Sequence, residues 1–126
     1  MTKHTIFVCT ACASVWKGNQ RVGESGGEKL HQQLSQLSET WELKAEFSIE
    51  PVTCMSACKR SCVVAFSASQ KPTYLFGNLS SPDAAHSILE CASKYYLKPD
   101  GKLPRKERPE LLKQRIIACV PPQLNR

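Results

Sequence analysis

The sequence predicts one mixed α/β domain, in which helices flank a central sheet of four strands. The chain has 126 residues and 41% hydrophobic content, which suits a single packed core. Two segments repeat apolar residues at helical spacing, and four short runs have the composition or alternation of strands. The expected order is strand, loop, helix, strand, cysteine-rich loop, two hairpin strands, helix and basic extension.

The first half of the chain is expected to hold a strand, a helix and a second strand. The first strand covers 3–8 and ends at Cys9, and a glycine-rich loop follows over 13–27. Apolar residues at spacings of four and three then predict a helix. The residues of its apolar face are Leu30, Leu34, Leu37 and Trp41. Apolar and polar residues alternate over 43–50, which predicts a half-buried strand that Pro51 ends.

The second half is expected to hold a hairpin, a helix and a short helical segment. Two apolar, β-branched runs at 62–68 and 73–76 are separated by a few residues, which predicts the hairpin. Ser81 and Pro82 are typical of the N-cap and first position of a helix. A further short helical segment is expected at 110–116, in a region rich in proline and charge.

Composition excludes some classes of protein and favours others. No apolar run approaches the length of a membrane span, which excludes an integral membrane protein. The amino terminus enters a strand directly, without a signal-peptide pattern, so we expect a cytoplasmic protein with reduced thiols. The net charge of +6 suits acidic partners. Nucleic acid is a less favoured partner, because the chain has 7% aromatic residues and no recognition motif.

The seven cysteines are the strongest functional signal in the sequence. An odd count in a reducing compartment argues against a disulfide framework and favours metal ligands or catalytic thiols. Cys9 and Cys12 are separated by two residues, and Cys54 and Cys58 by three, with Cys62 following. Both groups come at the ends of predicted strands, so their loops can converge at one edge of the sheet.

Three chemistries compete for these cysteines. A [2Fe–2S] cluster needs two thiolates on each iron, which two cysteine pairs can supply. A structural zinc ion accepts four thiolates from the same residues, and spacing alone does not separate it from the cluster. Thiol–disulfide exchange by Cys9 and Cys12 is the least favoured. Such a pair usually sits at a helix N-terminus, and the predicted helix starts some fifteen residues later.

Several segments resemble known families. The segments FVC at 7–9, EPVTCMSACKRSCVVAF at 50–66 and TYLFGNL at 73–79 resemble the thioredoxin-like [2Fe–2S] ferredoxins. The same fold carries the small cluster-bearing subunit of respiratory complex I. With its tail, the full chain resembles an uncharacterised bacterial family described as predicted metal-binding proteins. The resemblance implies a thioredoxin-like ferredoxin domain over 1–97, with a basic extension over 98–126 packed on the same domain.

The resemblance also implies a set of ligands. Cys9 matches the first ligand of the ferredoxins, and Cys54 and Cys58 match the pair that holds the second iron. Cys12 is then the fourth ligand, although the ferredoxins usually separate their first two cysteines by a longer loop. Cys62 lies where they need no ligand. We favour a buried strand residue there over an exchangeable ligand, because apolar residues follow it.

Two functions therefore remain open. The first is a small electron carrier, not an enzyme, that holds one [2Fe–2S] cluster. The second is a module that binds zinc or another metal, without redox activity, and acts through a protein partner. Between 98 and 115, the sequence contains seven basic residues and three acidic ones. This basic segment is either a solvated surface strip or a docking surface for an acidic redox partner. The sequence also leaves open whether the protein forms a homodimer.

The remaining chemically distinctive residues are expected to be structural. Cys91 shares a helix face with apolar residues, and Cys119 is isolated, so we predict that both pack in the core. The three histidines show no spacing to the cysteines that suggests a shared metal. Lys59 and Arg60 lie within the second cysteine group, where their positive charge would favour a reduced centre.

Overall fold

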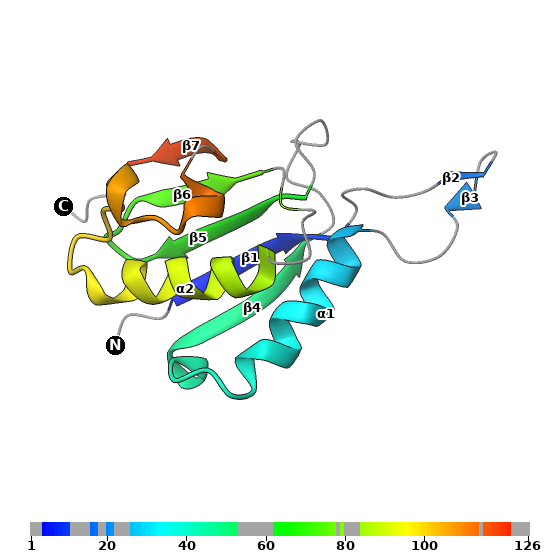
Figure 1. Ribbon diagram of the computed structural model, residues 1–126, viewed down its shortest axis with the longest axis horizontal. Coiled ribbons are helices and arrows are strands. Elements are labelled where there is room, and N and C mark those ends of the chain that lie inside the picture. The colour runs from blue at the N-terminus through cyan, green and yellow to red at the C-terminus, as the bar shows by residue number, and fades with distance from the viewer. Residues whose placement is uncertain are drawn as a thin grey trace.

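The computed structural model describes residues 4–10, 16–17, 20–21, 26–52, 62–77, 79, 84–113 and 115–121. They form a five-stranded mixed sheet in the order β4-β1-β5-β6-β7. Figure 1 shows α1 and α2 side by side on one face of this sheet. The predicted mixed α/β class is confirmed. The predicted count of four strands is wrong, because the C-terminal extension supplies a fifth.

The elements of the main sheet and its helices have the following bounds. The strands are β1 (His4–Cys9), β4 (Phe47–Val52), β5 (Val64–Ala68), β6 (Thr73–Phe76) and β7 (Ile116–Val120). The helices are α1 (Gly26–Ser38) and α2 (Ala84–Leu97). Short 3-10 turns are η1 (Lys44–Glu46), η3 (Arg105–Glu107) and η4 (Glu110–Leu112). A separate ribbon pairs β2 (Trp16–Lys17) with β3 (Gln20–Arg21), inside the region predicted as a loop.

The directions of the strands bring three chain segments to one edge of the sheet. β1 and β4 are parallel, whereas β5 runs antiparallel to β1 and pairs Val64 with Val8. β6 and β7 continue the antiparallel pattern. Consequently β1 and β4 end at the same edge, and β5 begins there.

One packed core lies between the sheet and the two helices. α1 buries Leu30 and Leu34 as its spacing predicts, and burying one leucine contributes about 2 kcal/mol. Leu37, which was predicted on the same apolar face, is 41% exposed. α2 buries one face of the helix. The ring of Tyr95 on this face packs near the ring of Phe66 on β5, with 5.7 Å between the ring centroids. The buried residues of α2 are Ala84, Ala85, Ile88, Leu89, Cys91, Ala92 and Tyr95. No helix in the described part of the chain is long and apolar enough to cross a membrane.

The strand predicted at 43–50 is shifted in the structure. Residues Lys44–Glu46 form the 3-10 turn η1, and the extended backbone begins at Phe47. The strand then continues through Pro51 to Val52, although proline was expected to end it. Proline is tolerated here because β4 is an edge strand, where one side of the backbone has no neighbouring strand in the main sheet.

The extension differs most from its prediction. The helix expected at 110–116 is reduced to the 3-10 turn η4, which η3 precedes. After it, Ile116–Val120 form β7 and pair with β6. The apolar, partly β-branched sequence IIACV favours a strand once an unpaired edge is available beside it. The predicted helix start at Ser81 and Pro82 lies outside the described residues, and α2 begins at Ala84.

Candidate metal centre

The edge where β1 and β4 end is held by backbone hydrogen bonds on both sides of Cys9. The Cys9 N–H donates to the carbonyl oxygen of Val63 at 3.0 Å. The Thr10 N–H and hydroxyl both donate to the carbonyl oxygen of Val52, at 2.8 and 3.1 Å. The ends of β1 and β4 and the start of β5 are thus tied together within two residues of Cys9.

Cys9 and Cys62 lie near each other at this edge. Each side chain is buried, with 1% of its surface exposed. Burial raises the pKa of the Cys62 thiol, and the neighbouring charge of Cys9 raises it further. Cys62 also belongs to the main core cluster, and its carbonyl oxygen accepts a hydrogen bond from the Leu79 N–H at 3.1 Å. The sequence favoured a buried residue at position 62, and Cys62 is indeed buried, just before β5 begins. It is also a neighbour of Cys9.

The first turn of α1 reaches the same edge. A Cβ atom on Gly27 would lie 1.9 Å from the carbonyl oxygen of Cys9, so the helix and the end of β1 are in direct contact. From the sequence, no helix was expected to begin near Cys9, and thiol exchange was disfavoured for that reason. This expectation is wrong, because the first turn of α1, distant along the chain, contacts Cys9 in the folded structure.

Of the four predicted ligands, Cys9 lies in the described structure. Cys12, Cys54 and Cys58 lie outside the described residues. Within the described ranges, no group of three or more histidine, cysteine, aspartate or glutamate side chains could hold a metal ion.

The two cysteines assigned to packing behave differently. Cys91 is fully buried on α2, as predicted, and burial raises the pKa of its thiol to about 12. Cys119 is exposed on the edge strand β7, so its assignment to the core is wrong. In the β6–β7 register it stands opposite Tyr74, whose pKa is raised mainly by burial and to a smaller extent by the neighbouring Cys119 thiol.

The buried histidine lies far from the cysteines. His4 is the first residue of β1 and Cys9 the last, which separates them by about 16 Å of extended chain. The Nε2 atom of His4 contacts the ammonium of Lys71 at 2.7 Å. His4 therefore lies too far from Cys9 to take part in the candidate metal centre.

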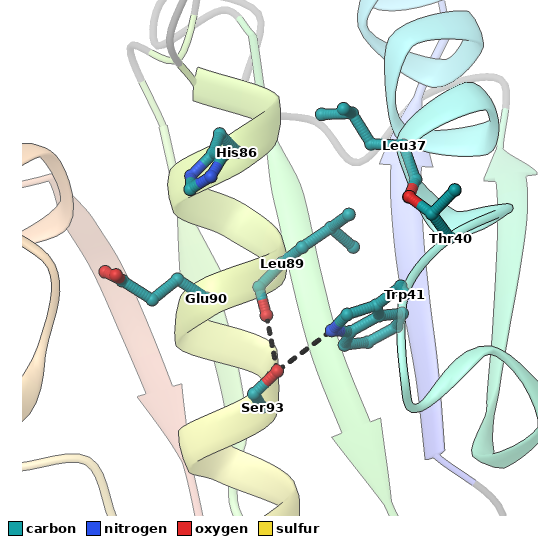
Figure 2. A pocket seen from close by; sticks show the side chains of 7 residues that line it. All are labelled: Leu37, Thr40, Trp41, His86, Leu89, Glu90 and Ser93. Atoms are coloured by element: carbon teal, nitrogen blue, oxygen red, sulfur yellow. Dashed lines mark hydrogen bonds between the residues drawn. The ribbon is translucent and has the colours of Figure 1, made fainter.

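Trp41 marks the other end of α1. It follows the helix instead of continuing it, and its indole N–H donates to the hydroxyl of Ser93 at 3.0 Å. Figure 2 shows this bond and the next one, from the Ser93 hydroxyl to the Leu89 carbonyl oxygen. They lie beside a pocket of about 310 Å³ between α1 and α2, which Leu37 and His86 also line. Since Gly27 at the opposite end of α1 contacts Cys9, Trp41 is remote from the candidate centre.

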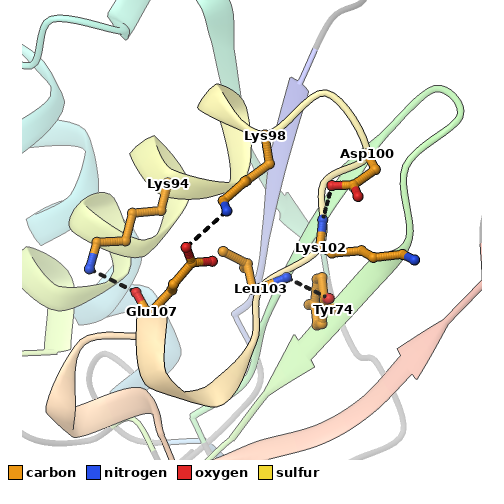
Figure 3. A network of polar contacts seen from close by, with 7 residues as sticks. All are labelled: Tyr74, Lys94, Lys98, Asp100, Lys102, Leu103 and Glu107. Atoms are coloured by element: carbon orange, nitrogen blue, oxygen red, sulfur yellow. Dashed lines mark hydrogen bonds and ion pairs between the residues drawn. The ribbon is translucent and has the colours of Figure 1, made fainter.

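Part of the positive charge around the extension is engaged within the chain. Figure 3 shows Lys98 paired with a carboxylate oxygen of Glu107 at 2.8 Å, and Lys94 donating to the Glu107 carbonyl oxygen at 2.7 Å. The hydrogen bond to Glu107 raises the pKa of Lys98. These lysines lie in and after the last turn of α2, and that helix runs away from the edge that holds Cys9.

Sequence reasoning missed two residues of this site. Thr10 ties β1 to β4 through two hydrogen bonds, and Gly27 allows α1 to contact Cys9. A signal for Gly27 was present, because paired glycines at the start of a predicted helix indicate a close backbone approach. Which backbone approaches Gly27 is decided by tertiary packing alone.

The comparison with solved structures defines the fold of the protein. The chain is similar to a structure described as that of a thioredoxin-like [2Fe–2S] ferredoxin from Aquifex aeolicus. The identity is 20%, the similarity covers 98% of each chain, and the TM-score is 0.62. The protein therefore has a thioredoxin-like fold, as the sequence resemblance implied.

The family follows from the sequence. The chain belongs to the family described as protein of unknown function (DUF1636), whose model matches residues 6–122. This range includes all seven cysteines and most of the basic extension. No curated protein sequence matches the chain at a significant level.

Proposed function

We propose that this chain is a small electron-transfer protein that binds one [2Fe–2S] cluster through cysteine thiolates. The proposed ligands are Cys9, Cys12, Cys54 and Cys58. One observation carries the proposal, namely that β1 ends, β4 ends and β5 begins at a single edge of the sheet. The thioredoxin-like fold supports it, because the similar Aquifex aeolicus protein is described as a [2Fe–2S] ferredoxin.

Chain connectivity supports a common site at this edge. Cys12 comes three residues after the end of β1, and Cys54 comes two residues after the end of β4. Cys58 comes four residues before Cys62, which is itself at the edge. Each step along the chain spans about 3.8 Å between Cα atoms. These short connections favour convergence of the four thiolates.

The donor set suits an iron–sulfur centre. A [2Fe–2S] cluster takes two cysteine thiolates per iron and supplies a group that accepts and returns one electron. In this chain the cysteines would hold the irons, and the buried side chains of Val63 and Leu79 would limit the access of water. The protein then acts as a carrier with an acidic redox partner, and not as an enzyme.

The partner is expected to approach the edge that holds Cys9. Lys29 in the first turn of α1 is exposed there, and Lys59 and Arg60 follow Cys58 in the sequence. An acidic partner would be steered by this charge, so the electron-transfer rate should fall as ionic strength rises. The lysines near Glu107 are less suited to this role, because they lie toward the other end of α2.

Anaerobic purification tests the proposal. The protein should be coloured, contain about two iron and two sulfide per chain, and be bleached reversibly by dithionite. A colourless protein that contains zinc and does not respond to dithionite would favour the metal-binding module instead. We expect a reducing compartment, in which cysteine thiols stay available as ligands.

Cysteine variants identify the ligands. Cys54→Ser and Cys58→Ser should each abolish the visible absorption, because each removes one of four thiolates. Cys119→Ser is the matched control, since Cys119 is exposed on β7 and should leave the iron content unchanged. Cys62→Ser should retain the cluster if Cys62 is a neighbour, and lose it if Cys62 is a ligand.

A second candidate function is thiol–disulfide exchange by Cys9 and Cys12. The contact between the first turn of α1 and Cys9 favours it, because a helix N-terminus stabilises a thiolate. Under this function, Cys12→Ser abolishes disulfide reduction and leaves the metal content unchanged. Under the proposed function, the same variant loses iron.

A further inference from the structure

Gly27, the second residue of α1, contacts the backbone of Cys9 so closely that no side chain fits between them. A Cβ on this residue would lie 1.9 Å from the Cys9 carbonyl oxygen, 3.0 Å from its carbonyl carbon and 3.1 Å from the Cα of Thr10. All three atoms belong to the backbone, which cannot rotate away as a flexible side chain can. Glycine is thus the residue that permits this approach.

Neither partner of this contact can move aside easily. α1 is anchored by Leu30 and Leu34, which are 3% and 0% exposed in the core. On the other side, the Cys9 N–H is bonded to the Val63 carbonyl oxygen at 3.0 Å. The Thr10 N–H is bonded to the Val52 carbonyl oxygen at 2.8 Å. A methyl group on residue 27 would therefore distort the helix start or displace Cys9.

The contact also has an electrostatic consequence. The first N–H groups of a helix have no acceptor within the helix, and its N-terminus carries about half a positive elementary charge. Gly27 brings this end of α1 against Cys9, which the proposed function makes a thiolate ligand. A positive charge at this place favours the reduced, more negative form of the centre.

We propose that Gly27 is a positioning residue for the metal centre. Its missing side chain seats the first turn of α1 on Cys9, which holds the Cys9 thiolate in place and sets the field around it. This inference rests on the proposed [2Fe–2S] function, and it concerns a residue that is itself no ligand.

Gly27→Ala tests the proposal, with Gly101→Ala as the matched control. Gly101 is also crowded, since its Cβ would lie 2.8 to 2.9 Å from the side chain of Lys71, and its φ of +68° disfavours other residues. Lys71 contacts His4 at the far end of β1, so both variants strain the fold but at opposite ends of the sheet. Both should unfold at a lower temperature than the wild type.

The two variants should differ at the centre. Gly27→Ala should lose iron to a chelator about tenfold faster than the wild type, as expected when support of a ligand is removed. Its reduction potential should shift to a lower value, and its spectrum in the reduced state should change. Gly101→Ala should keep the wild-type iron release, potential and spectrum.

If Gly27→Ala does not fold, a second variant and a second measurement still test the proposal. Thr10→Val removes the hydrogen bond of 3.1 Å from the Thr10 hydroxyl to the Val52 carbonyl oxygen. It should also release iron faster than the wild type, but by a smaller factor than Gly27→Ala. In metal-free protein, iodoacetamide should modify Cys9 slowly in the wild type, where 1% of the residue is exposed. The modification should be faster in Gly27→Ala and Thr10→Val.

The outcomes separate this inference from the proposed function. Equal iron release, potential and Cys9 modification in Gly27→Ala, Thr10→Val and Gly101→Ala would overturn the positioning role. A wild-type protein that holds zinc would overturn the [2Fe–2S] function, and the comparison would then use zinc release. If the wild type holds no metal, the modification of Cys9 still decides whether Gly27 positions it.

Discussion

Lys71 is a buried lysine whose three donors are used within the fold. With 8% of the residue exposed, its ammonium donates to the carbonyl oxygens of Tyr95 at 3.0 Å and Tyr96 at 3.2 Å, and contacts the His4 imidazole. Burial lowers the pKa of Lys71, and Asp100 partly opposes this effect. The two carbonyl groups belong to the last turn of α2, where backbone acceptors lack partners within the helix. Lys71 therefore caps α2 with a positive charge.

Replacing this lysine should destabilise the fold without affecting the metal centre. Lys71→Met keeps most of the apolar stem and leaves two helix-end carbonyl groups without their donor. We expect the free energy of unfolding in urea to fall by about 2 kcal/mol. The exposed Lys102 offers a control, and Lys102→Met should stay within about 0.5 kcal/mol of the wild type. Equal stability of the two variants would contradict the capping role.

Cys91 links stability to alkaline pH. Burial on α2 raises the pKa of its thiol from 9.0 to about 12, so the folded state keeps a proton that the unfolded state releases. This contribution is fully present below pH 9.0 and is lost as pH rises toward 12. Above pH 9 it should decline by about 1.4 kcal/mol per pH unit.

Cys91→Ala isolates this effect. At neutral pH the variant should be less stable than the wild type, because it leaves a small cavity in the core. The difference in unfolding free energy should shrink by about 2 kcal/mol when pH is raised from about 8 to about 10.5 under reducing conditions. A difference that stays constant with pH would show that the thiol is not protected from ionisation.

At the scale of elements, the turn between β5 and β6 contains a strained residue. Gln70 has a φ of +64°, in the left-handed region that residues with a side chain avoid. The turn closes through a hydrogen bond of 3.2 Å from the Lys71 N–H to the Ala68 carbonyl oxygen. The hairpin register that pairs Phe66 with Tyr74 therefore depends on a conformation that glycine would adopt more readily.

Glycine at this turn should stabilise the protein. Gln70→Gly should raise the free energy of unfolding by about 1 kcal/mol, and Gln70→Asn by less, because asparagine tolerates this region better than glutamine. Gln36→Gly is the matched control in α1, where the same substitution should cost about 1 kcal/mol. Thermal unfolding of the three variants would reveal the opposite signs, and destabilisation by Gln70→Gly would contradict the argument.

At the scale of the whole molecule, the basic extension completes the sheet and the core. β7 pairs with β6, and Leu103 and Leu112 are 1% and 0% exposed. The Leu103 N–H also donates to the hydroxyl of Tyr74 at 2.9 Å (Figure 3). The residues after α2 thus contribute a strand and two buried leucine side chains to the same core.

A chain that ends after Leu97 should therefore fold poorly. It lacks β7 and about 4 kcal/mol of leucine burial, which is close to the net stability of many domains. Circular dichroism should show a much lower unfolding temperature and a broader transition than in the full chain. A chain that ends after Pro121 keeps β7 and should unfold like the full chain. Cooperative unfolding of the shorter chain at the normal temperature would contradict the prediction.

Local patterns account for what sequence reasoning predicted well. The apolar run in β1, the leucine spacing of α1 and the alternation before Pro51 are short-range signals, and they found the right elements within a few residues. The β5–β6 hairpin was predicted for the same reason. The fold class and its thioredoxin-like character followed from these elements and from the residues around the cysteines.

Local patterns could not locate β7 or Cys119. The segment IIACV becomes a strand because β6 offers it an unpaired edge, and Cys119 is exposed because this new strand is itself an edge. The same limit applies to Trp41, which continues the helical spacing although α1 has ended at Ser38. Each outcome depends on which other part of the chain lies alongside.

The sequence by itself determined the family and the order of most elements, because both depend on residue type and spacing along the chain. The proposed cysteine ligands also come from spacing and resemblance, and they stay a prediction. Tertiary structure alone decided that Cys62 lies beside Cys9, that Gly27 lets α1 contact the end of β1, and that most of the basic extension lies away from this edge. The physical reason is packing. Strand directions and helix burial set distances in space that no local pattern encodes.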